Sequence, residues 1–284
     1  MTVRREKGTI VFGLVGLIFS VAYIEITRMC DLRCLHCYHK DNRKDSKMMD
    51  LRDYQKLVMS LAHNHRTSRF VILGGEPMLH PQVAEMIKFA SCFGSVDICT
   101  NGKETRGLLP VVGQIRKYRV SLDGLKRTHD EIRGKGSFDR ACASLKKMID
   151  HDCTGSVTTT VHEGNKEEII ALIEKMDRIG VRDIQIQQLI NSERTDGLSS
   201  LSEEGISALE EKINELRNEL NINIVFQREK PVSREKNVIS RLTIGPEGDV
   251  TFSPDNLGRQ KYIAKFDFEL SNFVIDIDRL MYQT

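Results

Sequence analysis

No cysteine follows Cys153 in this chain of 284 residues, and its seven cysteines are an odd number. Three of them lie within residues 30–37, whereas Cys92, Cys99, Cys142 and Cys153 are scattered. An odd number without regular pairing is not the pattern of a small secreted domain held by disulfides. We therefore expect a protein of a reducing compartment, with a cytoplasmic localisation.

A large excess of charge of either sign is also missing. The chain carries 42 basic and 40 acidic residues, which gives a formal net charge of +2. This balance offers no global electrostatic basis for binding nucleic acid, so we expect no nucleic-acid partner. The hydrophobic share of 40% is ordinary for globular proteins and can support a sizeable core.

No apolar run reaches the ~20 residues of a membrane-spanning helix. The nearest candidate, residues 9–23, follows Arg4, Arg5 and Lys7. A basic start before an apolar stretch resembles a signal peptide or a short anchor. We favour a buried hairpin or strand pair for this run, in an N-terminal apolar segment of residues 1–20, because the run continues directly into the strand before the clustered cysteines. Association of this segment with a membrane surface is the alternative.

Beyond residue 20 the chain alternates between strand and helix patterns. The predicted strands are residues 21–27, 70–73, 96–100, 118–122, 156–161 and 184–189. The predicted helices are residues 51–63, 81–91, 103–114, 138–151, 166–179 and 202–220, and one more strand is predicted at 222–226. Strands separated by helices pair in parallel with right-handed crossovers. Six such units predict an α/β protein with a partial (β/α)6 TIM-like barrel over residues 21–230.

The character of the sequence changes after residue 230. Residues 241–244 and 250–252 flank the glycine-rich stretch Gly245-Pro246-Glu247-Gly248-Asp249. Two short apolar stretches around such a turn predict a β-hairpin. We therefore expect residues 231–284 to form a small C-terminal appendage with a β-hairpin.

Three thiols within eight residues, Cys30, Cys34 and Cys37, are typical of a metal site. Soft sulfur ligands favour zinc or iron–sulfur clusters. A structural zinc site needs four ligands, and His36 or His39 could supply the fourth. The C-x3-C-x2-C spacing differs from the paired C-x2-C units that are usual for zinc. From the residues alone, an iron–sulfur cluster is favoured and zinc stays open.

This spacing resembles the motif that defines the radical S-adenosylmethionine (SAM) superfamily. Further matching motifs follow predicted strands, where parallel barrels carry their chemistry: Gly74-Gly75-Glu76-Pro77, Thr100-Asn101-Gly102, and Ser121-Leu122-Asp123-Gly124 with Arg133-Gly134 downstream. The whole pattern is similar to the branch that includes anaerobic sulfatase-maturating enzymes and other peptide maturases with a SPASM or twitch C-terminal extension.

The resemblance implies one [4Fe-4S] cluster on Cys30, Cys34 and Cys37, with one iron left open for SAM. It also implies reductive cleavage of SAM to a 5′-deoxyadenosyl radical that abstracts hydrogen from a substrate. The substrate would be a peptide or a small biosynthetic molecule, and an electron donor such as flavodoxin or ferredoxin would be needed. A non-catalytic metal- or SAM-binding partner protein is the alternative function.

Roles for single residues also follow from the resemblance. The implied SAM contacts are Gly74, Gly75, Glu76, Pro77, Ser121, Arg133, His36 and Leu189. Glu76 would accept a hydrogen bond from the SAM ammonium, Ser121 would contact the ribose, Arg133 would lie near the carboxylate, and His36 and Leu189 would lie near the adenine. Cys99 would be a catalytic residue that returns a hydrogen atom to a substrate radical.

Plainer alternatives stay open for several of these roles. Arg133 could pair with Asp130 or Glu131 on its own helical turn. Leu189 could be a core residue, and His36 an ordinary loop histidine. The scattered cysteines are expected to be small buried hydrophobic side chains.

The C-terminal region departs from the family pattern. SPASM and twitch members bind additional clusters through C-terminal cysteines, and this chain has none there. Ser253 and Pro254 stand where a cysteine is expected. We therefore predict a single cluster and an extension that keeps its scaffold without a metal. Redox-neutral chemistry is favoured over net oxidation.

Overall fold

The computed structural model describes residues 3–6, 9–12, 18–37, 39, 47–189, 197–227, 242–252, 262–269 and 271–275. The chain forms two compact units. The first contains Met1–Met29, Asn42–Asp97 and Val232–Thr284, and the second contains Cys30–Asp41 and Ile98–Pro231. Strand β5 (Ser95–Thr100) contributes its first half to the first unit and its second half to the second.

The first unit is built on two parallel strands, β3 (Val21–Thr27) and β4 (Arg69–Gly74). On its other side β3 pairs in parallel with β10 (Leu242–Ile244), so that Leu242 lies opposite Ala22. Three antiparallel strands continue from β10, namely β11 (Asp249–Phe252), β12 (Tyr262–Asp267) and β13 (Asn272–Ile275). The C-terminal region therefore extends the parallel core of this unit rather than standing apart from it.

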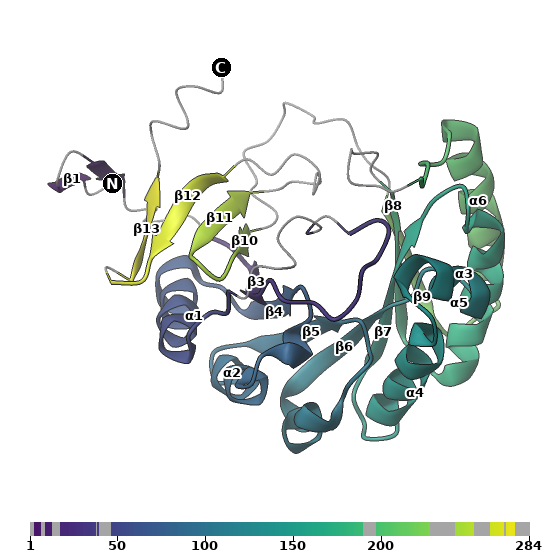
Figure 1. Cartoon of the computed structure of the whole chain (residues 1–284), viewed down its shortest axis with the longest axis horizontal. Coiled ribbons are helices and arrows are strands. Elements are labelled where there is room, and N and C mark those ends of the chain that lie inside the picture. Colours follow the sequence, from purple (N-terminus) through teal and green to yellow (C-terminus); the bar gives the residue numbers. More distant parts are fainter. Residues whose placement is uncertain are drawn as a thin grey trace. The chain divides into compact units, whose positions relative to one another are not determined.

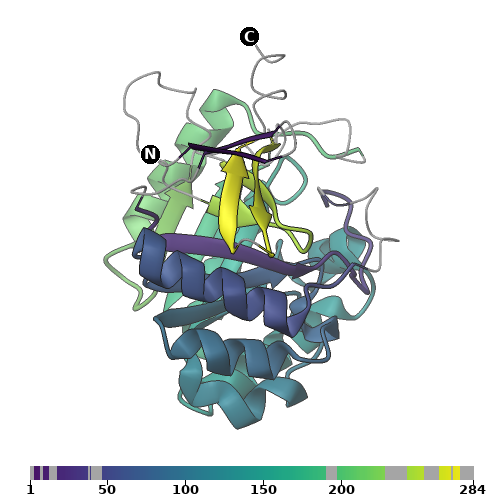
Figure 2. The same ribbon diagram turned by 90° about the vertical axis from the view of Figure 1, so that its left-hand side faces the viewer.

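Helix α1 (Leu51–His65) covers this parallel core of the first unit, as Figures 1 and 2 show. Its buried residues Tyr54, Leu57, Val58 and Leu61 recur at helical spacing, which gives one apolar face. The helix begins where Asp50 accepts a hydrogen bond from the amide of Arg52, a standard N-cap. Helix α2 (Val83–Ser91) packs beside α1, after the short 3₁₀ helix η2 (Pro77–Leu79).

In the second unit, parallel strands follow one another in chain order. They are β6 (Ile115–Ser121), β7 (Gly155–Val161), β8 (Asp183–Gln188) and β9 (Asn223–Gln227). Val157 on β7, Ile184 on β8 and Ile224 on β9 lie in register and are buried. Their common face packs on the connecting helices α4 (Ser137–Ile149), α5 (Ile169–Ile179) and α6 (Glu203–Leu216), which Figure 1 shows on one side of these strands.

Three remaining helical elements of the second unit differ from the sequence prediction. Residues 103–114 were expected to form an α-helix, but the structure has a 3₁₀ helix, η3 (Arg106–Gln114), with non-helical backbone at Val111. Pro110 explains the difference, because proline lacks an amide hydrogen and clashes with the preceding helical turn. Helix α3 (Lys126–Arg133) was not among the predicted helices, although a helical turn was assumed around Arg133. The short 3₁₀ turn η4 (Lys166–Glu168) precedes α5.

The N-terminal residues form a hairpin in which β1 (Val3–Glu6) pairs antiparallel with β2 (Thr9–Phe12). Only β2 of this pair lies in the apolar run at residues 9–23, residues 13–17 lie outside the described part, and burial of the pair stays a prediction. Among the described residues, no helix is both long and apolar enough to cross a membrane. The six predicted barrel strands and the hairpin around residues 245–249 are confirmed.

Candidate functional site

The clustered cysteines lie in the irregular segment that follows β3 and belongs to the second unit. Cys34 is buried, whereas Cys30 and Cys37 are partly exposed. None of the seven cysteines, all within the described residues, forms a disulfide. The amide of Leu32 points at the Cys30 sulfur over 3.5 Å, and the amide of Cys37 donates to the carbonyl of Cys34 over 3.2 Å. The segment thus presents three reduced thiols from a turn that its own backbone supports.

Arg133 places a positive charge against one of these thiols. Its Nη1 lies 3.9 Å from the Cys34 sulfur. The amide of Leu35 also donates to the carbonyl of Ile132 over 3.0 Å, which ties the cysteine segment to the end of α3. Burial acts to lower the pKa of Arg133, but the charges of Asp123 and Cys34 outweigh it and raise the pKa above its ordinary value. A permanent cation beside a thiol favours the thiolate, which is the form that binds metal.

Asp123 is a fully buried carboxylate that joins three elements of the second unit. It accepts hydrogen bonds from Arg133 Nε over 2.5 Å, from His36 Nε2 over 2.7 Å, and from the amide of Thr160 over 2.9 Å. Burial acts to raise the pKa of Asp123, but Arg133 and His36 outweigh it and hold the pKa well below its ordinary value. Asp123 is therefore an anion that fixes both the cysteine segment and the arginine beside it.

The backbone around Asp123 is fixed as well. Its amide donates to His129 Nδ1 over 3.2 Å, and its carbonyl accepts a hydrogen bond from Asn165 Nδ2 over 3.1 Å. Burial lowers the pKa of His129 to about 4, so this ring is neutral near pH 7 and can accept at Nδ1. Asn165 Nδ2 also donates to the carbonyl of Thr160 over 2.9 Å. The carboxylate is thus held in one orientation before any ligand binds.

The glycines of the Gly74-Gly75-Glu76-Pro77 motif lie in the first unit, against the end of β3. The amide of Gly75 donates to the carbonyl of Thr27 over 2.8 Å, and that of Glu76 to the carbonyl of Met29 over 2.7 Å. A Cβ at Gly74 would lie 2.2 Å from the Thr27 oxygen, and one at Gly75 would lie 2.2 Å from the Met29 oxygen. Close backbone approach within the chain itself therefore requires both glycines.

Glu76 and Pro77 start the 3₁₀ helix η2. Glu76 is 2% exposed, and its Oε1 accepts a hydrogen bond from the amide of Met78 over 3.1 Å. Pro77 stands at the first position of η2, where its missing amide hydrogen costs nothing. The capping contact uses one carboxylate oxygen, and a contact of Glu76 with SAM stays a prediction.

Asn101 binds the cysteine segment as well as its own turn. Its Nδ2 donates to Asp31 Oδ1 over 2.8 Å, and its Oδ1 accepts from the amide of Lys103 over 2.9 Å. Lys103 also forms an ion pair with Asp31. Asp31 directly follows Cys30, so this turn of the second unit restrains the segment near its first thiol.

The other predicted site residues are placed as follows. Ser121 is the last residue of β6 and is partly exposed. Leu189 is buried, its amide donates to the carbonyl of Val161 over 2.9 Å, and its carbonyl accepts from Ser200 Oγ over 2.6 Å. Cys99 is partly exposed on β5. Ser253 and Pro254 lie outside the described residues.

Two contacts differ from the alternatives weighed on the sequence. Arg133 pairs with Asp123 and not with Asp130, whose carboxylate instead accepts the amides of Gly136 and Phe138 at the start of α4. His36 is bound through Nε2 to Asp123. The sequence reasoning did not select Asp123, although its place directly after a predicted strand in Ser121-Leu122-Asp123-Gly124 was an available signal.

The donor set fits an iron–sulfur cluster. Within the described residues, no three side chains of His, Cys, Asp or Glu converge as the ligands of a single ion would. A four-iron cluster takes one thiolate per iron, so its thiols need not share one ion. The cysteine segment provides three such thiols. The amide of Leu32 beside Cys30 and the guanidinium of Arg133 beside Cys34 stabilise negative charge on the sulfur atoms.

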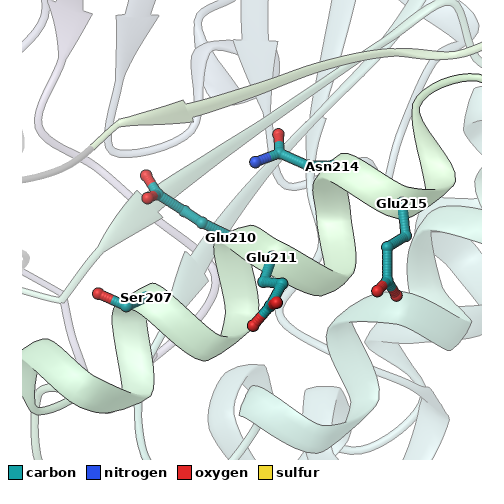
Figure 3. Close-up of a pocket in the computed structure, with 5 residues that line it drawn as sticks. All are labelled: Ser207, Glu210, Glu211, Asn214 and Glu215. Atoms are coloured by element: carbon teal, nitrogen blue, oxygen red, sulfur yellow. The ribbon is translucent and has the colours of Figure 1, made fainter.

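The described residues also form an open depression on the outer face of α6. Figure 3 shows its five lining side chains, which all come from this one helix: Ser207, Glu210, Glu211, Asn214 and Glu215. It contains none of the residues that the sequence motifs indicate, so the candidate site is the cysteine segment and its neighbours.

Comparison with known proteins gives a family match and several curated relatives. The profile of the Radical SAM superfamily matches residues 24–176. Antilisterial bacteriocin subtilosin biosynthesis protein AlbA of Bacillus subtilis (strain 168) is 31% identical over 168 residues, which are 57% of this chain and 37% of AlbA. Sporulation killing factor maturation protein SkfB of the same strain is 27% identical over 163 residues, 55% of this chain and 39% of SkfB. The chain thus spans less than two fifths of the length of either relative.

Solved structures share the fold at low sequence identity. Streptococcus suis SuiB bound to S-adenosylmethionine gives a TM-score of 0.71 at 16% identity, over 82% of this chain and 60% of SuiB. The structure of anSMEcpe with bound AdoMet and the Cp18Cys peptide gives a TM-score of 0.67 at 14% identity, over 83% of this chain and 74% of that one. The predicted partial TIM-like barrel with a C-terminal hairpin is confirmed.

Proposed function

This chain belongs to the radical SAM superfamily, a family of enzymes whose chemistry uses an iron–sulfur cluster and SAM, and from that premise we propose that it modifies a peptide by radical chemistry. The observation that carries the proposal is the C-x3-C-x2-C segment, which lies inside the matched residues 24–176. The buried Asp123–Arg133 pair beside Cys34 supports it, since it prepares a thiolate site in advance of metal binding.

In this proposal Cys30, Cys34 and Cys37 hold one [4Fe-4S] cluster. When bound, the cluster and SAM together supply reductive cleavage of SAM to methionine and a 5′-deoxyadenosyl radical, which abstracts a hydrogen atom from the substrate. A single cluster is proposed because no cysteine follows Cys153. Redox-neutral chemistry, or return of the hydrogen atom by Cys99, fits a protein without an auxiliary cluster.

The residues around the thiols orient and shield the site. Arg133 keeps a positive charge against Cys34, and Asp123 prevents its guanidinium from rotating away. His36, held by the same carboxylate, restrains the middle of the cysteine segment. Because Asp123 is completely buried, water does not compete for these hydrogen bonds. These residues therefore preorganise the segment on the side of Cys34.

The SAM contacts in the proposal are those that the family resemblance implies. They are His36, Gly74, Gly75, Glu76, Pro77, Ser121, Arg133 and Leu189. Glu76 is supported by its place after Gly74 and Gly75 at the carboxyl end of β4, where parallel α/β folds bind ligands. Ser121 is supported by its place at the carboxyl end of β6, where parallel α/β folds bind ligands.

A peptide is the favoured substrate class. AlbA and SkfB are named for the biosynthesis and maturation of a bacteriocin and a killing factor, and SuiB has been solved bound to its precursor peptide SuiA. We further propose that residues 21–230 form the catalytic core, with residues 1–20 and 231–284 as flanking segments. A cytoplasmic location and a flavodoxin or ferredoxin as electron donor complete the proposal.

The test is anaerobic reconstitution followed by reduction with dithionite and chromatography. The parent chain should form 5′-deoxyadenosine and methionine from SAM, slowly alone and faster with its substrate peptide. A variant with alanine at Cys30, Cys34 and Cys37 is the control and should form neither. A parent chain that carries its cluster but produces no 5′-deoxyadenosine above this control would favour a non-catalytic binding protein instead.

A further inference from the structure

The turn of the C-terminal hairpin is bound to the strand that leads into the cysteine segment. Arg28 lies two residues before Cys30, and its side chain is 10% exposed. Its Nη2 lies 2.8 Å from Asp249 Oδ2, and its Nη1 lies 3.4 Å from Glu247 Oε2. Lys47 pairs with the other oxygen of Glu247 over 2.6 Å. All of these residues belong to the first unit.

Two glycines allow this turn to present its carboxylates to Arg28. We call residues 245–249 the acidic turn. It closes through a hydrogen bond from the amide of Gly245 to the carbonyl of Asp249 over 2.8 Å. A Cβ at Gly245 would lie 2.5 Å from both carboxylate oxygens of Asp249, so any larger residue would displace the group that binds Arg28. Gly248 has a φ of +79°, and a Cβ there would lie 2.3 Å from the carbonyl oxygen of Phe266.

Residues 27–29 are restrained from two other directions in the same unit. Gly75 and Glu76 donate to the carbonyls of Thr27 and Met29, as described above. The amide of Arg28 donates to the carbonyl of Lys47 over 3.2 Å, and Thr27 Oγ1 donates to that carbonyl over 3.3 Å. The backbone bonds fix the position of this stretch, and the acidic turn adds a charged contact through the Arg28 side chain.

The acidic turn does not resemble a cation site that awaits a metal. Its two carboxylates already face Arg28 and Lys47. The hydrogen bond from Lys47 is the largest influence on the pKa of Glu247 and lowers it, with Arg28 and Lys265 acting in the same direction. The negative charge is thus already matched by protein cations, which is the signature of a structural ion-pair network.

We propose that the C-terminal hairpin is a positioning element for the cysteine segment, in which Glu247 and Asp249 bind Arg28 and so fix the chain that enters Cys30. An extension without cysteines then still serves the site, through parallel pairing of β10 with β3 and through this partly buried ion pair. Arg28, Glu247 and Asp249 are positioning residues and not catalytic ones. The consequence for the cluster rests on the proposed function, whereas the consequence for the backbone does not.

Hydrogen exchange of the full chain without metal, kept reduced and anaerobic, tests the backbone consequence. The variant combines Glu247→Gln with Asp249→Asn, which keeps the shape of both side chains and removes their charge. We expect exchange of the Gly75 and Glu76 amides to accelerate about tenfold, because these amides are bonded to Thr27 and Met29. The matched control Asp150→Asn removes the exposed Lys146–Asp150 pair and should leave both amides unchanged.

Unchanged protection of these amides in the folded double variant would overturn the proposal. If the double variant does not fold, Glu247→Gln alone should accelerate the same amides by a smaller factor, and no acceleration there would overturn it as well. In a second measurement, reconstituted double variant should lose iron to a chelator several times faster than the parent. Failure of the parent itself to assemble a cluster would count against the proposed function and leave the exchange result standing.

Discussion

Replacing Asp123 with asparagine should strongly destabilise the protein, because the change breaks a buried ion pair from one side only. Asparagine keeps the shape of the side chain and can still accept from the amide of Thr160, but it leaves Arg133 with an uncompensated charge at 11% side-chain exposure. Removal of one partner from a buried ion pair costs about 3–5 kcal/mol. We expect the lower end, about 3 kcal/mol, because the Thr160 contact survives.

The assay is thermal unfolding of the metal-free chain, followed by circular dichroism under reducing conditions. A loss of about 3 kcal/mol corresponds to a midpoint lower by about 6–12 °C for a protein of this size. Asp150→Asn, which removes an exposed ion pair, is the control and should shift the midpoint by less than about 2 °C.

The pH dependence has a definite sign. The folded pKa of Asp123 lies well below its ordinary value, so its contribution is fully present above the unfolded pKa of about 3.9. It is lost only as the pH falls through the folded pKa. The Asp123 carboxylate should therefore stay ionised from pH 6 to 8, so its own titration adds no pH dependence to the difference between parent and Asp123→Asn in this range. A midpoint shift at pH 7 no larger than the control's would refute the reasoning.

Substitutions at three further positions, two of them with a matched control variant, test the site. Arg133→Met should shift the reduction potential of the cluster to more negative values, because a cation near a thiolate stabilises the reduced state. The control Arg133→Lys should retain most of the parent potential. Both potentials can be measured in a redox titration followed by electron paramagnetic resonance. Glu76→Ala should weaken SAM binding by roughly 1.5–3 kcal/mol in anaerobic calorimetry, and unchanged affinity in a cluster-loaded variant would count against its role. Gly75→Ala should lower the free energy of unfolding by about 2 kcal/mol or more, since its Cβ would lie 2.2 Å from the Met29 oxygen. The control Gly113→Ala should change the unfolding midpoint little, because a Cβ at that position meets open space.

Some barrel strands could be predicted because they are short and end at a glycine-containing turn, as at Gly74-Gly75, Asn101-Gly102 and Asp123-Gly124. Helix α3 could not, because Lys126-Arg-Thr-His-Asp-Glu-Ile-Arg133 has only one aliphatic residue and so no apolar periodicity. The parallel pairing of β10 with β3 joins residues more than 200 positions apart, and local patterns do not encode such pairing. The hairpin was therefore predicted, but its attachment was not.

The candidate site, too, could be predicted from the sequence only in part. Spacing alone identified Cys30, Cys34 and Cys37, because metal ligands on one segment leave a local signature. The role of Asp123 depends on His36, 87 positions away, and on Thr160, 37 positions away, so it emerges only from the fold. The glycines at 74 and 75 were expected to make room for a ligand, and the structure adds that the chain's own carbonyls require them.

Mössbauer spectroscopy of the chain reconstituted with iron-57, recorded with and without SAM, can show whether Cys30, Cys34 and Cys37 hold a cluster with one open iron. Three cysteine ligands leave one iron of a four-iron cluster open, so we expect about four irons per chain and a changed spectrum for one of them when SAM is added. The variant with alanine at Cys30, Cys34 and Cys37 should contain no cluster. A cluster with no iron that responds to SAM, or a chain that binds zinc in place of iron, would show that the proposed site is wrong.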